Sequence, residues 1–192
     1  LKGLRQIADE LGLLLMYDEV QCGMGRTGKL FAHEWPDVAP DIMAVAKGLG
    51  GGFPVGACLA VERVASVMTA GTHGSTFGGN PLAMAAANAV MDVMLADGFL
   101  SGVSKIAGYL WGRLEEIATK YPSFFADVRG QGLMMGIKCV EEGANAKLSG
   151  KLLELGMLTV LAGDNVLRLV PPLIITEAEV NEAIGLIDQA TD

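Results

Sequence analysis

The first hundred residues alternate apolar runs with glycine-rich or polar segments. Three runs, at 11–17, 42–47 and 55–61, have the length of strands, and the only charge among them is the lysine that ends the second. Continuous apolar runs of this length are typical of strands covered on both faces, as in parallel sheets. A helix is predicted at 81–97, because Asn80 is a suitable N-cap and a proline follows it at the first helical position. This half of the chain therefore predicts an α/β fold, a mostly parallel sheet with helices.

The second half has a different pattern, which predicts a smaller α+β unit. Apolar positions recur with helical spacing over 100–120, which predicts an amphipathic helix. Strand pairs around glycine-containing turns are predicted in 125–140 and 158–173. Thr176 with Glu179 three residues later is the signature of a capping box, so a terminal helix is expected to begin there.

The length and composition indicate a protein with a sizeable core, expected as two domains at 1–100 and 101–192. Hydrophobic residues make up 51% of the chain and charged residues 19%, with a formal net charge of −8 at pH 7. This acidic balance argues against a basic surface for nucleic acid. No basic tract accompanies an apolar face, so binding to a membrane surface is not expected either.

Cysteine and histidine usage indicates a reducing compartment and no metal centre. The three cysteines, Cys22, Cys58 and Cys139, are far apart and odd in number, as expected for free thiols in the cytoplasm. With two histidines in the chain, a metal site built from His and Cys is not expected. The apolar runs are far shorter than the ~18 residues of a membrane span, and residues 1–10 do not have the pattern of a signal peptide.

Glycines 23, 25 and 28 have the spacing of a dinucleotide-binding fingerprint, which leaves a nucleotide-binding oxidoreductase as an alternative. Their context differs from that motif. Residues 18–22 separate the apolar run from the first glycine, and the segment after the last one is too short for the expected helix. The acidic residues also precede the glycines, where they would repel a pyrophosphate.

Asp18 and Lys47 are the strongest candidates for chemistry. Each one follows an apolar run that is predicted to be a strand of the same sheet, so both are expected at its carboxyl edge, where α/β sheets bind ligands. A lysine enclosed by glycines can become a nucleophile that forms a Schiff base. One lysine and one carboxylate are what pyridoxal phosphate requires, because the carboxylate keeps the pyridine nitrogen protonated. Each residue alone also fits a solvated strand end.

Two further segments carry candidate ligands for anions. Ser75 and Thr76 lie in a loop with four glycines ahead of the helix predicted at 81–97. Hydroxyls and free backbone amides in such a loop bind phosphate well, although a plain polar loop has the same composition. Arg168 lies between two leucines of a predicted strand, so it is expected on the opposite face from both. It is either an exposed arginine or one whose guanidinium binds a substrate carboxylate through two hydrogen bonds.

Four motifs carry a resemblance to a known family: DEVQCGMGRTGKLFAHE, PDIMAVAKGLGGGFPVGA, GTHGSTFGGNPLA and LRLVPPL. In this order and spacing they resemble the class III pyridoxal-phosphate aminotransferases, of fold type I. The resemblance extends over the 192 residues and is greatest to the acetylornithine aminotransferases. It implies part of a cofactor-binding large domain at 1–100 and a small C-terminal α+β domain at 101–192.

The resemblance also implies roles for residues of the first domain. Lys47 would form the Schiff base with pyridoxal 5'-phosphate and transfer the proton, which makes it the catalytic residue. Asp18 would bind the pyridine nitrogen, Gln21 would lie beside the phenolic oxygen, and Val20 would pack on the ring. Glu19 is included with them as a cofactor-binding residue.

The remaining implied roles concern substrate and subunits. Thr76 would contact the phosphate of the neighbouring subunit's cofactor, which implies a homodimer with shared active sites. Ser75 would lie near the substrate, and Arg168 would receive its α-carboxylate. The implied reaction transfers the δ-amino group of N-acetylornithine to 2-oxoglutarate, as in arginine biosynthesis.

Members of the family are longer on the N-terminal side, so the resemblance implies that this chain begins within the large domain. The family's phosphate loop, its ring-stacking aromatic and a second arginine have no counterpart here. Three alternatives within the family follow: ornithine, succinylornithine and 4-aminobutyrate aminotransferases. An inactive fragment of such an enzyme is a further alternative.

Overall fold

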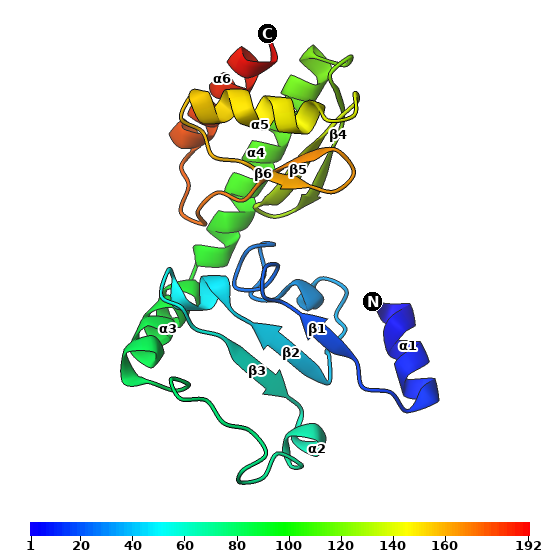
Figure 1. The fold of residues 1–192 in the computed structure, drawn as a ribbon, viewed down its shortest axis with the longest axis vertical. Helices are drawn as coiled ribbons and strands as arrows, with labels where there is room; N and C mark the ends of the chain where they lie inside the picture. Colours follow the sequence, from blue (N-terminus) through cyan, green and yellow to red (C-terminus); the bar gives the residue numbers. More distant parts are fainter. The chain divides into compact units, whose positions relative to one another are not determined.

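Two separate sheets organise the chain in the computed structural model, which describes residues 1–192 (Figure 1). The chain divides into two units, Leu1–Leu100 and Ser101–Asp192. The first unit contains α1 (Lys2–Leu11), β1 (Met16–Asp18), the 3-10 helix η1 (Ala32–Glu34), β2 (Ile42–Val45), the 3-10 helix η2 (Lys47–Gly50), β3 (Ala57–Ala60), α2 (Glu62–Ala65) and α3 (Pro81–Met94). The second contains α4 (Phe99–Lys120), which begins just before it, β4 (Phe125–Gln131), β5 (Met134–Cys139), α5 (Ala144–Glu154), β6 (Val160–Ala162), β7 (Val166–Leu169) and α6 (Glu177–Thr191).

The sheet of the first unit has the strand order β1-β2-β3. β1 and β2 are parallel, with Asp18 opposite Ala44, so their carboxyl ends lie at the same edge. β3 runs antiparallel to β2. The predicted parallel pairing therefore holds for the two strands that precede Asp18 and Lys47.

The predicted burial of the first-unit strands is correct only in part. Met43 and Val45 of β2 are buried, as is Tyr17 of β1. Met16, next to Tyr17, is 63% exposed, and all four residues of β3 are exposed. β2 is the central strand, whereas β1 and β3 are edges whose outer faces no element of the unit covers. The prediction of strands buried on both faces is therefore wrong for the runs 11–17 and 55–61.

One buried carboxylate fastens the amino-terminal edge of this sheet. Asp41, just before β2, accepts hydrogen bonds from the Leu15 amide at 2.8 Å and from Arg5 Nη1 of α1 at 2.8 Å. Arg63 of α2 forms a further ion pair with it. The Leu15 amide and then the Arg5 guanidinium lower the pKa of the Asp41 carboxyl. A single side chain thus joins α1, β2 and α2.

The second unit has an antiparallel sheet with the strand order β4-β5-β7-β6. α5 packs on this sheet and on α6 (Figure 1). The core is closed: its fully buried side chains include Leu114 of α4, Ile137 of β5, Leu152 of α5, Leu167 of β7 and Ile187 of α6. The predicted strand pairs and helices of this half are confirmed.

Two helix starts match the sequence predictions in atomic detail. The Asn80 side chain accepts a hydrogen bond from the Ala83 amide at 2.9 Å, which satisfies a free N–H at the start of α3. Thr176 and Glu179 form the predicted capping box at α6.

No single helix is both long and apolar enough to span a membrane; α3 and α4 reach that threshold only when they are taken together across the break between them.

Candidate active site

Asp18 and Lys47 come from neighbouring parallel strands at one edge of the first-unit sheet. Asp18 is the last residue of β1, and Lys47 follows β2 after a single intervening residue, Ala46. Both side chains are exposed, and neither forms an ion pair. The structure therefore brings a carboxylate and a primary amine to the same edge, as the two apolar runs predict.

Lys47 has an unusual backbone conformation, with φ at 45°. The left-handed region is costly for a residue with a Cβ, by roughly 1–2 kcal/mol, and such residues cluster at functional sites. Here the conformation turns the chain directly from β2 into the 3-10 helix η2. The loop that follows is tight, because a Cβ on Gly50 would lie 2.8 Å from Val55 Cγ1 and one on Gly51 2.7 Å from Val90 Cγ2.

The segment after β1 is a compact turn that begins at Asp18. Asp18 Oδ1 accepts a hydrogen bond from the Val20 amide at 3.0 Å. The Gly23 amide donates to the Glu19 carbonyl at 3.0 Å, and a Cβ on Gly23 would lie only 2.7 Å from that oxygen. Glycine is required at 23 so that the turn can close beneath Asp18.

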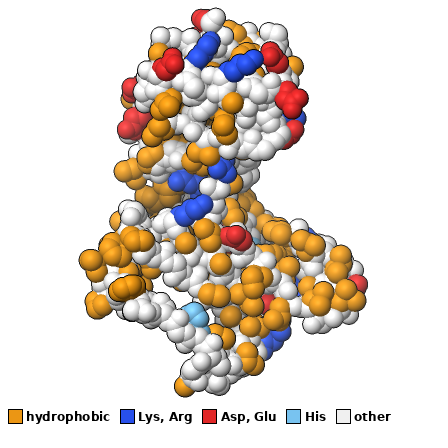
Figure 2. Space-filling model, in the orientation of Figure 1, with side chains coloured by type: hydrophobic (Ala, Val, Ile, Leu, Met, Phe, Trp, Pro, Cys, Tyr) orange, Lys and Arg blue, Asp and Glu red, His pale blue; other side chains and the backbone are white.

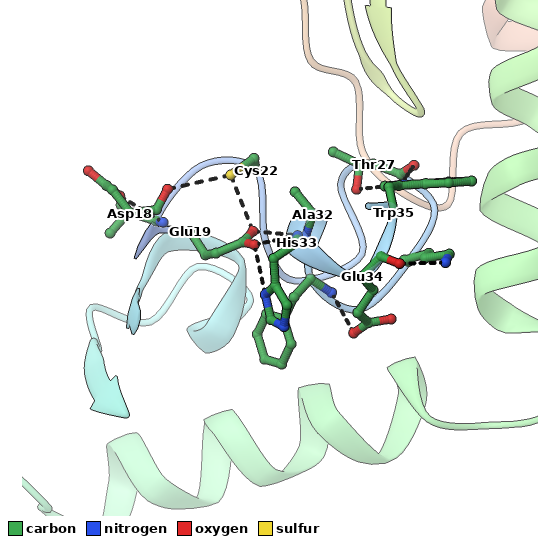
Figure 3. Close-up of polar contacts among 11 residues, drawn as sticks. Asp18, Glu19, Cys22, Thr27, Ala32, His33, Glu34 and Trp35 are labelled. Atoms are coloured by element: carbon green, nitrogen blue, oxygen red, sulfur yellow. Dashed lines mark hydrogen bonds and ion pairs between the residues drawn. The ribbon is translucent and has the colours of Figure 1, made fainter. Parts of the chain in front are cut away.

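Glu19 points away from the sheet edge into the turn, where its side chain is only 2% exposed (Figure 3). Its Oε1 accepts from the His33 amide at 2.8 Å and lies 3.2 Å from His33 Nδ1. Its Oε2 accepts from the Ala32 amide at 2.9 Å and from Cys22 Sγ at 3.2 Å. Glu19 was predicted as a cofactor contact, but both of its carboxylate oxygens are engaged with the turn and with η1.

Cys22 is part of this arrangement through its thiol. Burial, followed by the hydrogen bond to Glu19, raises the pKa of the Cys22 thiol to about 11. The thiol is therefore protonated at neutral pH and acts as a donor, which is the form that the Glu19 carboxylate requires. A protonated thiol is a poor nucleophile, so Cys22 is a structural donor at this position.

The glycine-rich segment 23–28 is a buried loop and has no helix after it. Gly23, Gly25 and Gly28 are buried, and the loop closes on itself through the Gly25 amide, which donates to the Leu30 carbonyl at 3.1 Å. The three-residue 3-10 helix η1 follows in place of the crossover helix that a dinucleotide site needs. The fingerprint spacing is therefore a feature of loop packing here.

Ser75 and Thr76 lie in the exposed loop 69–79, which leads to α3. Ser75 Oγ accepts a hydrogen bond from the Gly78 amide at 2.9 Å, so this hydroxyl shapes the loop itself. Both residues precede the start of α3 on an exposed segment, as expected from the sequence. Their predicted roles toward phosphate and substrate remain predictions.

Arg168 belongs to the second unit, where it lies in β7 opposite Gly136 of β5 and Val160 of β6. Its two neighbours Leu167 and Leu169 are buried, whereas Arg168 is partly exposed. It lines an apolar cleft of about 210 Å³ in this unit. An arginine beside apolar side chains suits a carboxylate with an aliphatic chain, and its binding role also remains a prediction.

Sequence comparison identifies the family of the chain. A family model described as "Aminotransferase class-III" matches residues 1–191. The chain belongs to the class-III aminotransferase family. The family inferred from the four sequence motifs is thus confirmed.

Curated class-III relatives resemble the chain over its whole length. The acetylornithine aminotransferase of Mesorhizobium japonicum is 59% identical over 187 residues, which cover 97% of this chain and 46% of that protein. The enzyme of the same name from Brucella melitensis is 55% identical over 192 residues, which cover 100% and 47%. The chain thus spans about half the length of the curated relatives it matches.

Solved class-III structures have the same fold over almost all of the chain. The N-acetylornithine aminotransferase of Stenotrophomonas maltophilia superposes with a TM-score of 0.87 at 38% identity, covering 99% of this chain and 50% of that one. The ornithine aminotransferase of Plasmodium yoelii gives a TM-score of 0.89 at 34% identity, covering 98% and 50%. The predicted fold, part of a fold type I aminotransferase, is confirmed.

The residues at the sheet edge fit pyridoxal phosphate, the cofactor on which class-III aminotransferases depend in general. The donor set contains one exposed carboxylate, Asp18, for a protonated pyridine nitrogen and one exposed primary amine, Lys47, for an aldehyde. Both extend from the same edge, where the register of β1 and β2 holds them. One related structure, an ornithine aminotransferase from Toxoplasma gondii, is described with partial occupancy of this cofactor at its active site.

Proposed function

We propose that the protein that carries this chain is an acetylornithine aminotransferase. It would transfer the δ-amino group of N-acetylornithine to 2-oxoglutarate with pyridoxal 5'-phosphate, in the cytoplasm and as part of arginine biosynthesis. The observation that carries the proposal is the pair Asp18 and Lys47 at the carboxyl ends of two paired parallel strands. The substrate follows from the curated relatives named acetylornithine aminotransferase, at 59% and 55% identity.

Lys47 holds the cofactor and moves the proton in this proposal. When bound, pyridoxal phosphate supplies an aldehyde that takes up amino groups and a ring that accepts electrons. The Lys47 amine would hold this aldehyde and would also serve as the base that moves the proton. Its exposure at the sheet edge and its position in a tight glycine loop support both roles.

Asp18 and its neighbours orient the ring. The Asp18 carboxylate pairs with the pyridine nitrogen and holds the proton there, which keeps the ring able to accept electrons. Val20 packs on the ring, and Gln21 hydrogen-bonds beside its phenolic oxygen. The turn that begins at Asp18 carries all three residues in sequence and supports this assignment.

Three residues outside the sheet edge have proposed roles toward phosphate and substrate. Thr76 contributes its hydroxyl to the phosphate of a partner subunit's cofactor, so the active form is a homodimer. Ser75 lies beside the substrate. Arg168 binds the α-carboxylate with its two-pronged guanidinium, and the apolar cleft that it lines supports this role.

Covalent trapping tests the cofactor assignment directly. The protein that carries this chain is incubated with pyridoxal phosphate, reduced with borohydride and digested, and the labelled lysine is identified by mass spectrometry. We expect a yellow complex and a label on Lys47 that Lys47→Ala removes, whereas the exposed control Lys105→Ala keeps it. Equal labelling of several surface lysines, or fluorescence quenching by a nicotinamide cofactor in place of a yellow complex, would contradict the proposal.

Steady-state kinetics test the substrate assignment. The values of kcat/KM for N-acetylornithine, ornithine and 4-aminobutyrate are compared with 2-oxoglutarate as acceptor, on the protein that carries this chain. We expect N-acetylornithine to be preferred. A preference for ornithine or 4-aminobutyrate would overturn the substrate while leaving the cofactor assignment in place.

A further inference from the structure

We propose that Glu19 is a positioning residue: through its buried carboxylate it holds Asp18 and the loop of Lys47 in the geometry that binds the cofactor. This inference rests on the proposed function. It assigns to Glu19 no contact with the cofactor, but support of the residues that are proposed to contact it. It replaces the expectation that Glu19 itself touches the cofactor, because its side chain points into the turn (Figure 3).

The contacts of Glu19 use the full capacity of both its oxygens. Oε1 faces two nitrogens of His33 and Oε2 faces the Ala32 amide and Cys22 Sγ, at distances between 2.8 and 3.2 Å. A carboxylate only accepts hydrogen bonds, so four donors converge on it. A buried carboxylate is tolerated only when it is satisfied in this way. Glu19 is therefore the centre of the turn, and the turn and η1 are held together by it.

Its backbone connects the same residue to the strands. The Glu19 amide donates to the Ala44 carbonyl at 2.9 Å, and Ala44 is the register partner of Asp18. The Glu19 carbonyl accepts from the Gly23 amide at 3.0 Å. Glu19 thus has its main chain fixed to β2 and its side chain fixed to η1. Asp18 immediately before it and Val20 immediately after it cannot turn independently.

The same turn supports the loop that carries Lys47. Met24 lies in the left-handed region, with φ at 53°, and its side chain is buried. A Cβ on Gly48 would lie 3.0 Å from Met24 Cβ, so the two loops are already in tight contact. A change that loosens the turn at Glu19 is transmitted through Met24 to the residue after Lys47. Both candidate cofactor contacts therefore depend on one buried carboxylate.

Glu19→Gln is the appropriate substitution because it keeps the shape and changes only the hydrogen bonding. An amide presents an NH₂ group where one carboxylate oxygen stood, so two of the four donors would face another donor. The matched control is Glu34→Gln on η1, the short helix that carries two of the residues that donate to Glu19. Glu34 is a partly buried glutamate, and its Oε1 accepts a single hydrogen bond, from the Phe31 amide at 3.0 Å.

The test measures how tightly pyridoxal phosphate is held at Lys47. Borohydride trapping over a range of cofactor concentrations gives the concentration at which Lys47 is half labelled, and urea unfolding confirms that each variant is folded under the same conditions. We expect Glu19→Gln to raise that concentration by about tenfold. Glu34→Gln should leave it unchanged.

A double variant separates positioning from general destabilisation. Because Glu19 supports both Asp18 and the loop of Lys47, Glu19→Gln should raise the half-labelling concentration less in the Asp18→Asn background than in the wild type. If the role of Glu19 were purely structural, Glu19→Gln would change the free energy of unfolding without changing Lys47 labelling in the folded chain. Any effect on the half-labelling concentration would then be additive with that of Asp18→Asn. Additive effects, or unchanged labelling in Glu19→Gln, would overturn the inference.

The two proposals fail in different ways. If the wild-type protein that carries this chain shows no selective labelling of Lys47, the proposed function fails and this inference falls with it. If the wild type labels selectively and Glu19→Gln does so equally well, only the positioning role is refuted.

Should Glu19→Gln not fold, a milder pair carries the same test. Cys22→Ser keeps a donor near Glu19 Oε2, whereas Cys22→Ala removes it. We expect Cys22→Ser to label like the wild type and Cys22→Ala to need a few-fold higher cofactor concentration. Equal labelling of the serine and alanine variants would count against the inference.

Discussion

The two units bury their apolar residues in different ways. In the second unit, helices α4, α5 and α6 and the four-stranded sheet enclose a core in which Leu114 and Ile137 have no exposed surface. In the first unit, most large apolar side chains of α1 and of the edge strands remain exposed, including Leu11 at 67% and Met16 at 63%. Figure 2 shows broad apolar areas over the first unit, whereas charged side chains are scattered over the second.

The unit with the closed core is the second one, whereas the proposed cofactor contacts lie on the sheet of the first unit. The second unit encloses its own core, so its periodic apolar pattern and its burial agree. In the first unit two buried carboxylates with several hydrogen-bond partners each, Glu19 and Asp41, lie at opposite edges of a small sheet. There the hydrogen bonds of two buried carboxylates connect the strands on which the proposed site depends to the neighbouring elements.

The largest expected effect comes from the closed core. Leu114→Ala should lower the free energy of unfolding by about 2–5 kcal/mol, because it leaves a cavity in a fully packed site. Leu14→Ala in the first unit, at a side chain that is 50% exposed, should cost much less. Urea unfolding of the two variants measures the comparison directly. Similar losses in both would show that the first unit has a core as closed as that of the second.

Next in size is the carboxylate that fastens the first sheet. Asp41→Asn removes the charge that Arg5 and Arg63 contact, so it should destabilise the chain at pH 7. The pKa of Asp41 is lowered on folding, so its contribution is fully present above the unfolded pKa of about 3.9 and is lost as the pH falls below it. Unfolding at pH 7 and near pH 2 should therefore show a difference between wild type and Asp41→Asn that shrinks in acid. A constant difference would contradict the assignment.

The helix caps offer a matched pair, one in each unit. Asn80→Ala at α3 and Thr176→Ala at α6 should each cost about 1 kcal/mol, since each leaves a first-turn amide unsatisfied. Thermal unfolding measures both. Asn80→Asp and Thr176→Ser keep a capping oxygen and serve as controls that should stay near wild type. A much smaller loss at Asn80 than at Thr176 would show that α3 contributes little to the folded state.

The smallest expected effect is a gain in the second unit. Gly108 lies within α4, and a Cβ there would meet nothing within 4 Å. Gly108→Ala should therefore stabilise the chain by about 0.5–1 kcal/mol, because alanine favours the helix and space is free. Gly130→Ala is the opposite control, since its Cβ would lie 2.2 Å from the Met134 carbonyl oxygen. Calorimetry should show a rise in melting temperature for the first and a fall for the second.

Local signals in the sequence were sufficient wherever the partners are close in the chain. The capping box of Thr176 and Glu179 and the cap at Asn80 lie within three residues, so the pattern specifies the contact. The edge shared by Asp18 and Lys47 was also predictable, because two apolar runs in a parallel pair must end on the same side.

Burial and long-range contacts could not be predicted in the same way. The run 11–17 is apolar enough for a buried strand. Its exposure depends on whether another element covers it, and the hydrophobic pattern of the run does not contain this information. Apart from the Cys22 thiol, the side-chain partners of Glu19 lie 13 and 14 residues away, in a segment with no repeating pattern. The signal that could have revealed them is an acid two residues after the buried Tyr17 and just before a tight glycine turn. The left-handed backbone conformation of Lys47 could not be predicted, because nothing in the neighbouring sequence indicates a positive φ at a lysine.

That backbone conformation has a consequence for how this site can be dissected and how it could evolve. A lysine at φ 45° has a backbone conformation that is unfavourable for a residue with a Cβ. The position therefore lowers the stability of the fold, while the proposed chemistry needs its amine. Glycine there would relieve roughly 1–2 kcal/mol of steric cost and add a similar amount of chain entropy, so Lys47→Gly should be about as stable as the wild type. Lys47→Gly would therefore remove the amine at nearly unchanged stability, so this substitution can separate a loss of function from a loss of fold.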